Sequence, residues 1–308
     1  MLNVAQTPAP RVSIIIPHLN GPELLEHCVA ALVAQEPATI SREIIVVDNG
    51  SRQPPEEVCA RFAGVRLETE ATPGPGPARN RGAILARGEI LAFIDADCLA
   101  APGWLTAIVG YFDTHPEIGF VGGDIGIATR SPKGMTAIEA YEAMYSYRAE
   151  MFVRRDGYAA TGNMAVRRAV FEAVGPFEGI RVYEDVRWGQ AARAMGHGLD
   201  FVPDALVRTP ACDSYAGLCK RIDRHVAHEL AETDLAGMGG AKWVLRGLLM
   251  AGSPIAELPW LMTTPRLRGR ERWLALGCLA SVRLYRAARM FEALFSRRYA
   301  GRLATWNR

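Results

Sequence analysis

One stretch, residues 89–98 with the sequence EILAFIDADC, constrains the fold most. Its first half is a nearly continuous run of apolar, strand-forming residues, which is typical of a strand buried on both faces of a parallel sheet. The run ends in two carboxylates on alternate residues, Asp95 and Asp97. Buried acids are costly unless a cation neutralises them, and open α/β sheets bind ligands at the carboxyl ends of their strands. The stretch therefore suggests a metal and phosphate site, although a D-x-D pair alone also fits an ordinary polar strand exit.

Two further buried strands are predicted upstream of this stretch. Residues 11–17 (RVSIIIP) form a β-branched run stopped by proline, and residues 43–48 (EIIVVD) end in an acid. Between them, residues 21–35 place apolar side chains at helical spacing. Strand, helix and strand in this order indicate a parallel βαβ unit. With a shorter strand expected at 65–68, the pattern predicts an α/β fold with a Rossmann-like, mostly parallel sheet and flanking helices.

The rest of the chain changes character near residue 210. Before that point, strands are expected at 118–127, 164–166 and 201–202, the last one stopped by Pro203. After it, the alternation of strands and helices ends and only helical patterns follow. We therefore expect an α/β domain over residues 1–210 and a helical, basic region over residues 211–308.

The helical region is strongly basic at its end. From residue 265 onward the chain carries eleven arginines against two glutamates. One predicted helix there has an apolar face and a basic face, a pattern typical of membrane-surface binding, with packing against the enzyme as the alternative. Its apolar face would carry Leu284, Ala288, Phe291 and Phe295, and the arginines away from it are Arg283, Arg286 and Arg289.

Composition narrows the class of protein. Hydrophobic residues make up 49% and charged residues 22% of the chain, a globular composition with a net charge of +2. The six cysteines are scattered without a C-x-x-C pair, which favours reduced thiols over disulfides or a zinc site. No secretory pattern and no apolar run of about 18 residues is found. We expect a cytoplasmic protein, peripheral on the cytoplasmic face of the membrane if the tail binds lipid, and no nucleic-acid partner.

Five segments, in order and spacing, resemble the family-2 inverting glycosyltransferases of GT-A fold. The resemblance covers roughly residues 12–207, and several motifs in the right order are stronger than any single one. It implies an enzyme that transfers a sugar from a nucleotide-sugar donor to a hydroxyl of a glycan or lipid-linked acceptor. It also implies a GT-A sheet followed by a helical C-terminal extension. The segments are VSIIIPHLN (12–20), EIIVVDNGS (43–51), GPARNRGAILARGEILAFIDADC (76–98), TGNMAVRR (161–168) and GPFEGIRVYED (175–185).

The resemblance assigns a divalent cation to the two acids of the opening stretch. Departure of a nucleoside diphosphate builds negative charge, which a metal held by carboxylates neutralises. Asp97 matches the direct metal ligand, and Asp95 matches a partner of the ribose or of the metal. Hard oxygen ligands and phosphate suit Mg²⁺ or Mn²⁺.

Other donor contacts follow from the same resemblance. Asp48, at the end of the second predicted strand, matches the acid that contacts the nucleotide base. Pro17 and Asn20 match the edge of the nucleotide pocket. Arg79, in a proline- and glycine-rich stretch expected to be a loop over 72–82, matches a basic residue near the diphosphate, a role suited to a fixed cation. For Arg79 and Asn20, bracing of loops is the alternative.

The acceptor side is assigned to the last two motifs. Inversion needs a base that takes the proton of the acceptor hydroxyl opposite the leaving group. The Glu184-Asp185 pair matches the family's E-D motif, with Asp185 as the expected base and Glu184 as the alternative. Gly162 and Asn163 match a segment lining the acceptor side, where glycine lets substrate approach the backbone.

One position departs from the family pattern. Many relatives place a histidine shortly after the last strand, where it completes the metal shell, but here Arg208 or Thr209 stands in that place. Either Asp97, diphosphate and water hold the metal alone, or Arg208 replaces part of its charge.

Two other functions compete with transfer. The missing histidine suggests a catalytically degenerate nucleotide-sugar-binding subunit. A sugar nucleotidyltransferase would instead need a Gly-rich basic loop after the first strand, where the chain has PHLNGP (17–22).

Overall fold

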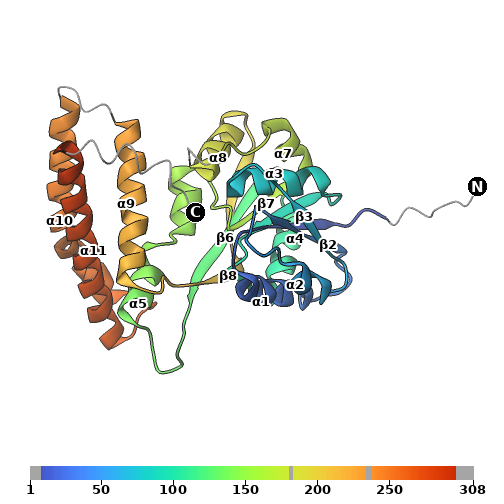
Figure 1. Ribbon diagram of the computed structural model, residues 1–308, viewed down its shortest axis with the longest axis horizontal. Coiled ribbons are helices and arrows are strands. Elements are labelled where there is room, and N and C mark those ends of the chain that lie inside the picture. Colours follow the sequence, from blue (N-terminus) through green and yellow to red (C-terminus); the bar gives the residue numbers. More distant parts are fainter. Residues whose placement is uncertain (1–7, 180–182, 234–237, 296–308) are drawn as a thin grey trace, which may run out of the picture. The chain divides into compact units, whose positions relative to one another are not determined.

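The described strands form a single mixed sheet of eight strands (Figure 1). The computed structural model describes residues 8–179, 183–233 and 238–295. The strand order is β3-β2-β1-β4-β7-β6-β8-β5. The strands are β1 (Val12–His18), β2 (Arg42–Asp48), β3 (Val65–Thr69), β4 (Ile90–Ile94), β5 (Leu99–Ala100), β6 (Ile118–Ala128), β7 (Asn163–Arg167) and β8 (Gly198–Pro210).

The first four strands are parallel, as the sequence predicted. Strand β1 pairs with both β2 and β4, and β2 pairs with β3. Every residue of β4 is buried, which explains its continuous apolar sequence. The register sets Pro17 opposite Val47 and His18 opposite Asp48, so the carboxyl ends of β1 and β2 lie level. Beyond β4 the direction reverses, because β7 runs antiparallel to both β4 and β6.

Helices cover both faces of the sheet (Figure 1). On one face Gly82 of α3 lies against Ile15, Phe171 of α7 packs on Phe93 of β4, and Trp188 of α8 stacks on Phe171. On the other face α1 joins α4 through Gln35, whose Oε1 accepts from the Leu105 amide. The helices of this part are α1 (Pro22–Val33), α2 (Glu56–Ala60), α3 (Pro75–Leu85), α4 (Trp104–Thr114), α6 (Ala149–Met151), the π-helix η1 (Phe152–Asp156), α7 (Arg168–Val174) and α8 (Glu184–Ala194).

Two local predictions are wrong. The stretch over 72–82 is not a loop throughout, because α3 begins at Pro75. Proline fits the first turn of a helix, where its missing N–H would have no partner. The last strand does not stop at Pro203 but continues to Pro210, pairing with β5 on the way. Pro203 and Asp204 are both exposed and interrupt the alternation of buried and exposed residues there, which is how a strand tolerates proline.

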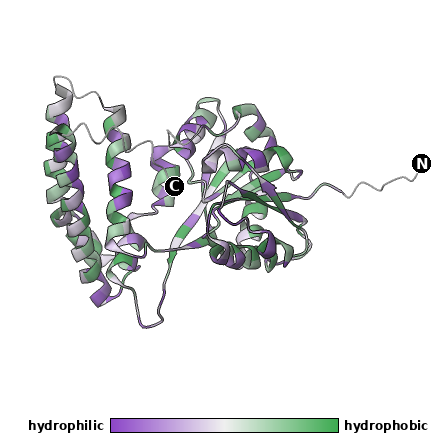
Figure 2. Cartoon of the chain, viewed as in Figure 1, coloured by the Kyte–Doolittle hydropathy of each residue, from purple (hydrophilic) through white to green (hydrophobic). Residues whose placement is uncertain are grey.

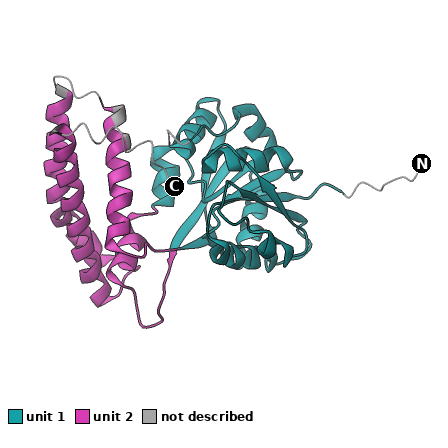
Figure 3. Cartoon of the chain, viewed as in Figure 1, with its two compact units in different colours: residues 1–126, 148–209 teal, residues 127–147, 210–308 magenta. Residues whose placement is uncertain are grey.

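The chain divides into two compact units, residues 1–126 with 148–209 and residues 127–147 with 210–308 (Figure 3). The second unit therefore includes residues 127–147 besides the C-terminal helices. Its first helix begins with a capping box in which Thr136 and Glu139 bond each other's backbone amides. The indole of Trp243 is buried and donates to the Met290 carbonyl, 2.8 Å away. The unit's helices are α5 (Ala137–Tyr145), α9 (Tyr215–Glu232), α10 (Met238–Thr263) and α11 (Gly269–Phe295).

Within the described residues, no helix combines the length and the apolar character needed to cross a membrane.

We predict that Phe93→Ala lowers the free energy of unfolding by about 3–5 kcal/mol, the range for a large aromatic deleted from a packed core. The ring is fully buried and lies 5.3 Å from that of Phe177 and 5.7 Å from that of Phe171, centroid to centroid. Urea denaturation followed by circular dichroism measures the change. Ile84→Ala, at a side chain 76% exposed on α3, is the control and should change stability by no more than about 0.5 kcal/mol. Equal effects of the two substitutions would contradict this packing.

Candidate functional site

The ends of β1 and β2 form a small hydrogen-bonded network around Asp48. The carboxylate is buried and accepts from the His18 ring at 3.0 Å and from the hydroxyl and amide of Ser51. Because a carboxylate only accepts, His18 Nδ1 carries the proton of this bond. Burial raises the pKa of Asp48, but the hydrogen bonds from Ser51 and His18 outweigh it and leave the pKa below its usual value. Asp48 is thus held as an anion.

Asn20 connects the loops that follow these two strands. Its side-chain oxygen accepts from the backbone amide of Arg52, and its backbone amide donates to Ser51 Oγ, both at 2.9 Å. The residue has φ of 52°, a left-handed conformation that asparagine tolerates better than most residues. Pro17 is half-buried beside Val47 at the same strand ends. Loop bracing by Asn20, one of the two alternatives, is therefore observed in the structure.

Arg79 lies on α3 and links two segments far apart in the sequence. Its guanidinium donates to Asp95 at 2.7 Å and to Glu184 at 3.0 Å, while only 3% of the residue is exposed. Burial alone would lower the pKa of Arg79, but the charges of Asp95 and Glu184 raise it above its usual value. Arg79 is therefore a permanent cation with two carboxylate partners. We call Arg79, Asp95, Glu184 and Asp185 the Arg79 cluster.

Asp95 and Asp97 follow β4 directly, in a turn closed by a hydrogen bond from the Cys98 amide to the Asp95 carbonyl at 3.0 Å. One oxygen of Asp95 is used by Arg79, and the Cys98 thiol lies 3.7 Å from an oxygen of Asp97. Among the residues that the structure describes, no three His, Cys, Asp or Glu side chains gather to hold a metal ion. Two carboxylates nevertheless fit Mg²⁺ or Mn²⁺, which proteins often bind with one or two acids while phosphates and water supply the other ligands.

The segment before β7 faces the same acids. A Cβ at Gly162 would lie 2.8 Å from Oδ2 of Asp95, so only glycine leaves room for this carboxylate. Asn163 is buried, and its amide nitrogen donates to the carbonyls of Asp124 and Ala205. Its oxygen accepts from the Trp104 indole at 2.8 Å. The Asn163 side chain therefore links strands and α4, and Gly162 is the one of the pair that adjoins an acid of the cluster.

Glu184 and Asp185 begin α8, and residues 180–182 of the motif lie outside the described residues. Asp185 accepts from the amide of Val186 at 2.8 Å. Burial raises the pKa of Asp185 to about 6, and the neighbouring charge of Glu184 adds to the rise, while Arg79 opposes it. A carboxylate with a pKa near 6 holds a proton more strongly than an ordinary aspartate and is still ionised at neutral pH.

The position of the missing histidine lies beside the two acids. Leu99 of β5 pairs with Arg208 of β8, which brings the next residue, Thr209, beside Cys98. Thr209 is buried and its hydroxyl interacts with the Cys98 thiol. Arg208 points to the other face and is exposed, with a guanidinium nitrogen over Gly126. Neither side chain supplies a typical metal ligand here.

Sequence reasoning missed two features of the site. The first is His18, the buried partner of Asp48, whose Nε2 has no hydrogen-bond partner among the described residues. Its place directly after Pro17, at a strand end, was the available signal. The second is the bridge from Arg79 to Glu184, which spans 105 positions and has no local signature.

Comparisons with known proteins agree on one family. The model of Glycosyl transferase family 2 matches residues 13–175, more than half of the chain. Glycosyltransferase AglE of Haloferax volcanii is 32% identical over 209 residues, covering 66% of this chain and 67% of AglE. An uncharacterized glycosyltransferase of Nostoc, alr2836, is 27% identical over 183 residues, covering 56% and 55%.

A solved structure supports the fold. The mannosyltransferase PcManGT of Pyrobaculum calidifontis, determined in complex with GDP-Man and Mn²⁺, aligns over 97% of this chain and 79% of its own. The TM-score is 0.56 at 20% sequence identity, a likeness of fold. The expected GT-A architecture is thereby confirmed.

We predict that Arg79→Met lowers the free energy of unfolding by about 3 kcal/mol, the lower end of the range for removing one partner of a buried ion pair. The lower end applies because Asp95 is 40% exposed and recovers some hydration. Denaturant unfolding measures the loss. Arg61→Met, which breaks an exposed pair with Glu26, is the matched control and should cost less than about 1 kcal/mol. An Arg79→Met protein as stable as the control would contradict the bridging role.

Proposed function

The chain belongs to glycosyl transferase family 2, and on this premise we propose that the Arg79 cluster is the catalytic centre of an inverting, metal-assisted transfer. The enzyme transfers a sugar from a nucleotide-sugar donor. The observation that carries the proposal is the single buried guanidinium that contacts Asp95 on one side and Glu184 on the other. Arg79 thereby fixes the donor-side acid Asp95 relative to Glu184, the neighbour of the candidate base Asp185.

The donor is proposed to bind at the carboxyl ends of β1, β2 and β4. Asp48, held ionised by Ser51 and His18, would accept hydrogen bonds from the base, with Pro17 and Asn20 at the edge of its site. Arg79 would place positive charge near the diphosphate. PcManGT was solved with GDP-Man, so GDP-mannose is the first donor to test.

Asp97 and Asp95 would hold a divalent cation, with Mn²⁺ supported by the PcManGT complex. When bound, such a cation neutralises the charge that develops on the departing diphosphate. The carboxylates that follow β4 would orient it, while the hydrogen bond from Arg79 fixes the position of Asp95. Arg208 is exposed on the opposite face from Thr209 and would add charge only at a distance.

Asp185 is proposed as the base. As the acceptor oxygen forms its bond to the anomeric carbon, its proton moves to the Asp185 carboxylate. The bond from that carbon to the diphosphate breaks, and the diphosphate leaves with the electron pair, so the configuration inverts. Glu184 is committed to Arg79, which leaves Asp185 the better placed of the two. Gly162, without a side chain, would let the acceptor approach, whereas Asn163 would act only by shaping the strand. The acceptor is proposed to be a hydroxyl of a glycan or of a lipid-linked saccharide.

We predict that Asp97→Ala abolishes the effect of Mn²⁺ on donor binding. Donor and metal should together raise the melting temperature of the wild type, because ligands that bind only the folded state stabilise it. In the variant the metal should add nothing to the shift. Asp113→Ala, an exposed acid at the end of α4, is the control and should behave as the wild type. An unchanged metal response in Asp97→Ala would rule out this ligand assignment.

Asp185→Asn should keep donor binding and lose transfer by about 10²-fold or more, the usual contribution of a general base. The same change should stabilise the fold at neutral pH. Because the folded pKa is about 6 and the ordinary value 3.8, the carboxylate destabilises the fold increasingly as the pH rises through this window. The gain is therefore up to about 3 kcal/mol at pH 7 and vanishes near pH 3.5, by linkage. Wild-type transfer by Asp185→Asn would refute the role of Asp185 as the base. A variant less stable than the wild type at pH 7 would refute the destabilising burial of its carboxylate.

The pH dependence of transfer follows from the same carboxyl. Below about pH 6, kcat/KM should fall about tenfold per pH unit as Asp185 takes up a proton. Initial rates at limiting donor and acceptor, from pH 4.5 to 8.5, measure this limb. The residual rate of Asp185→Asn should show no such limb. A wild-type rate that stays flat down to pH 4.5 is incompatible with this base.

A further inference from the structure

The arginines of α11 are used inside the second unit. Arg286 is ion-paired with Glu229 of α9, and Arg283 lies 2.7 Å from the sulfur of Met250 on α10. The guanidinium of Arg289 lies 5.2 Å from the ring centre of Tyr285. The Nε atoms of all three are buried. Arg286 and Arg283 therefore contact α9 and α10, and Arg289 contacts its own helix, which supports the alternative that this basic face packs within the protein.

The expected apolar face of α11 is also partly covered. Phe291 packs on α10, since a Cβ at Gly247 would lie 3.0 Å from its ring. Leu284 remains 57% exposed, and the side chain of Phe295 lies outside the described residues. Within the described residues of this unit, a larger exposed apolar surface lies outside α11.

That surface is on α10. At 100° per residue, its large exposed side chains fall within an arc of about 140°, one continuous face of the helix. Exposure reaches 80% at Ile255, and Gly252, Ala256 and Pro259 on the same face are exposed too. Figure 2 shows much of this helix as hydrophobic. We define the α10 stripe as Leu245, Leu248, Leu249, Ile255 and Trp260.

Positive charge flanks the α10 stripe at both ends. Lys242 is exposed before it, and Arg266, Arg268 and Arg270 are exposed after it, whereas Arg246, next to Leu245, is ion-paired with Glu229. The helix contains one acid, Glu257, which is half-buried and lies off the stripe. Trp260, 45% exposed near the end of α10, and Trp273, 64% exposed in the first turns of α11, lie on either side of the three arginines after the stripe in the sequence. Indole rings prefer the boundary between headgroups and acyl chains.

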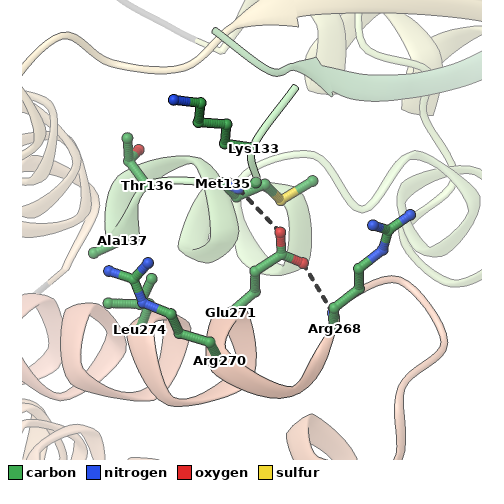
Figure 4. Close-up of a pocket in the computed structure, with 9 residues that line it drawn as sticks. Lys133, Met135, Thr136, Ala137, Arg268, Arg270, Glu271 and Leu274 are labelled. Atoms are coloured by element: carbon green, nitrogen blue, oxygen red, sulfur yellow. Dashed lines mark hydrogen bonds between the residues drawn. The ribbon is translucent and has the colours of Figure 1, made fainter. Parts of the chain in front are cut away.

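Arg268 and Arg270, which belong to the cationic group after the stripe, line a cavity of about 430 Å³ within the same unit (Figure 4). Lys133, Arg268 and Arg270 contribute three cations to its wall against one acid, Glu271. The Glu271 carboxylate already accepts hydrogen bonds from the backbone amides of Met135 at 3.0 Å and Arg268 at 2.8 Å. The wall therefore keeps an excess of positive charge, which suits an anionic headgroup.

We propose that the α10 stripe binds the surface of an anionic lipid bilayer, with the helix in the membrane plane and its basic ends on headgroup phosphates. An apolar face with flanking cations and interfacial tryptophans is the pattern of such helices. A second copy of the chain fits less well. The stripe is about 22 Å long and 10 Å wide, roughly 220 Å², whereas a stable dimer needs about 800 Å² per partner. Two stripes of like-charged ends would also repel each other.

This inference deepens the proposed function, since a membrane is where lipid-linked acceptors reside, but its test needs neither donor nor transfer. The full chain is floated with vesicles of equal parts phosphatidylcholine and phosphatidylglycerol, and with vesicles of phosphatidylcholine alone. The wild type should bind the anionic vesicles, and Leu248→Glu with Ile255→Glu should weaken its partition by about tenfold or more, because each charge enters the acyl boundary. Replacing Arg266, Arg268 and Arg270 by glutamine should remove the preference for anionic vesicles.

Ile84→Glu, at an equally exposed apolar residue on α3, is the matched control and should bind vesicles as the wild type does. Circular dichroism and melting curves establish that each variant is folded. Failure of the wild type to bind anionic vesicles, or equal binding by the stripe variant, would overturn the proposal. So would a concentration-dependent wild-type dimer that the stripe variant loses, because the stripe would then be a protein interface. Donor hydrolysis measured without vesicles reports separately on the proposed function.

Discussion

The ion pairs of Arg79 are the constraint on which the site depends. A buried guanidinium is costly unless carboxylates surround it, and two carboxylates near one another repel unless a cation separates them. Arg79 meets both conditions by contacting Asp95 after β4 and Glu184 at the start of α8. Residues that are 105 positions apart are thereby fixed to one point. Asp185, next to Glu184, is half-buried at the start of α8, and burial and the charge of Glu184 raise its pKa although Arg79 opposes the rise.

The rest of the sheet explains why these groups meet. Parallel strands β1, β2 and β4 end at the same edge of the sheet. Their pairing alone therefore brings Pro17, Asp48 and Asp95 to that edge. The antiparallel β7 then returns along β4 and brings Gly162 to the same acid. The absence of a side chain at Gly162 and the buried hydrogen bonds of Asn163 have different physical roles, although the two residues are adjacent.

Local patterns predicted the strands well because burial on both faces leaves an apolar run that is visible in the sequence. They failed at α3, where prolines and glycines that usually mark loops instead fill a helix start. They also failed at β8, whose length depends on pairing with distant strands. The candidate residues came from motif resemblance, whereas the Arg79–Glu184 contact and the burial of His18 required the tertiary structure. The same holds for α11, where Arg286 pairs with Glu229 of α9 and Arg283 contacts Met250 of α10.

We propose that the fixed guanidinium of Arg79 organises both sides of the site, and the Arg79→Lys variant probes this role. Lysine keeps the charge but lacks the planar fork that holds two carboxylates at once. Calorimetric titration of the donor, followed by single-turnover transfer, gives both readouts on one protein. We expect Arg79→Lys to bind donor at least about tenfold more weakly, equal to about 1.4 kcal/mol, and to transfer the sugar more slowly. Wild-type donor affinity and wild-type transfer in Arg79→Lys would contradict it.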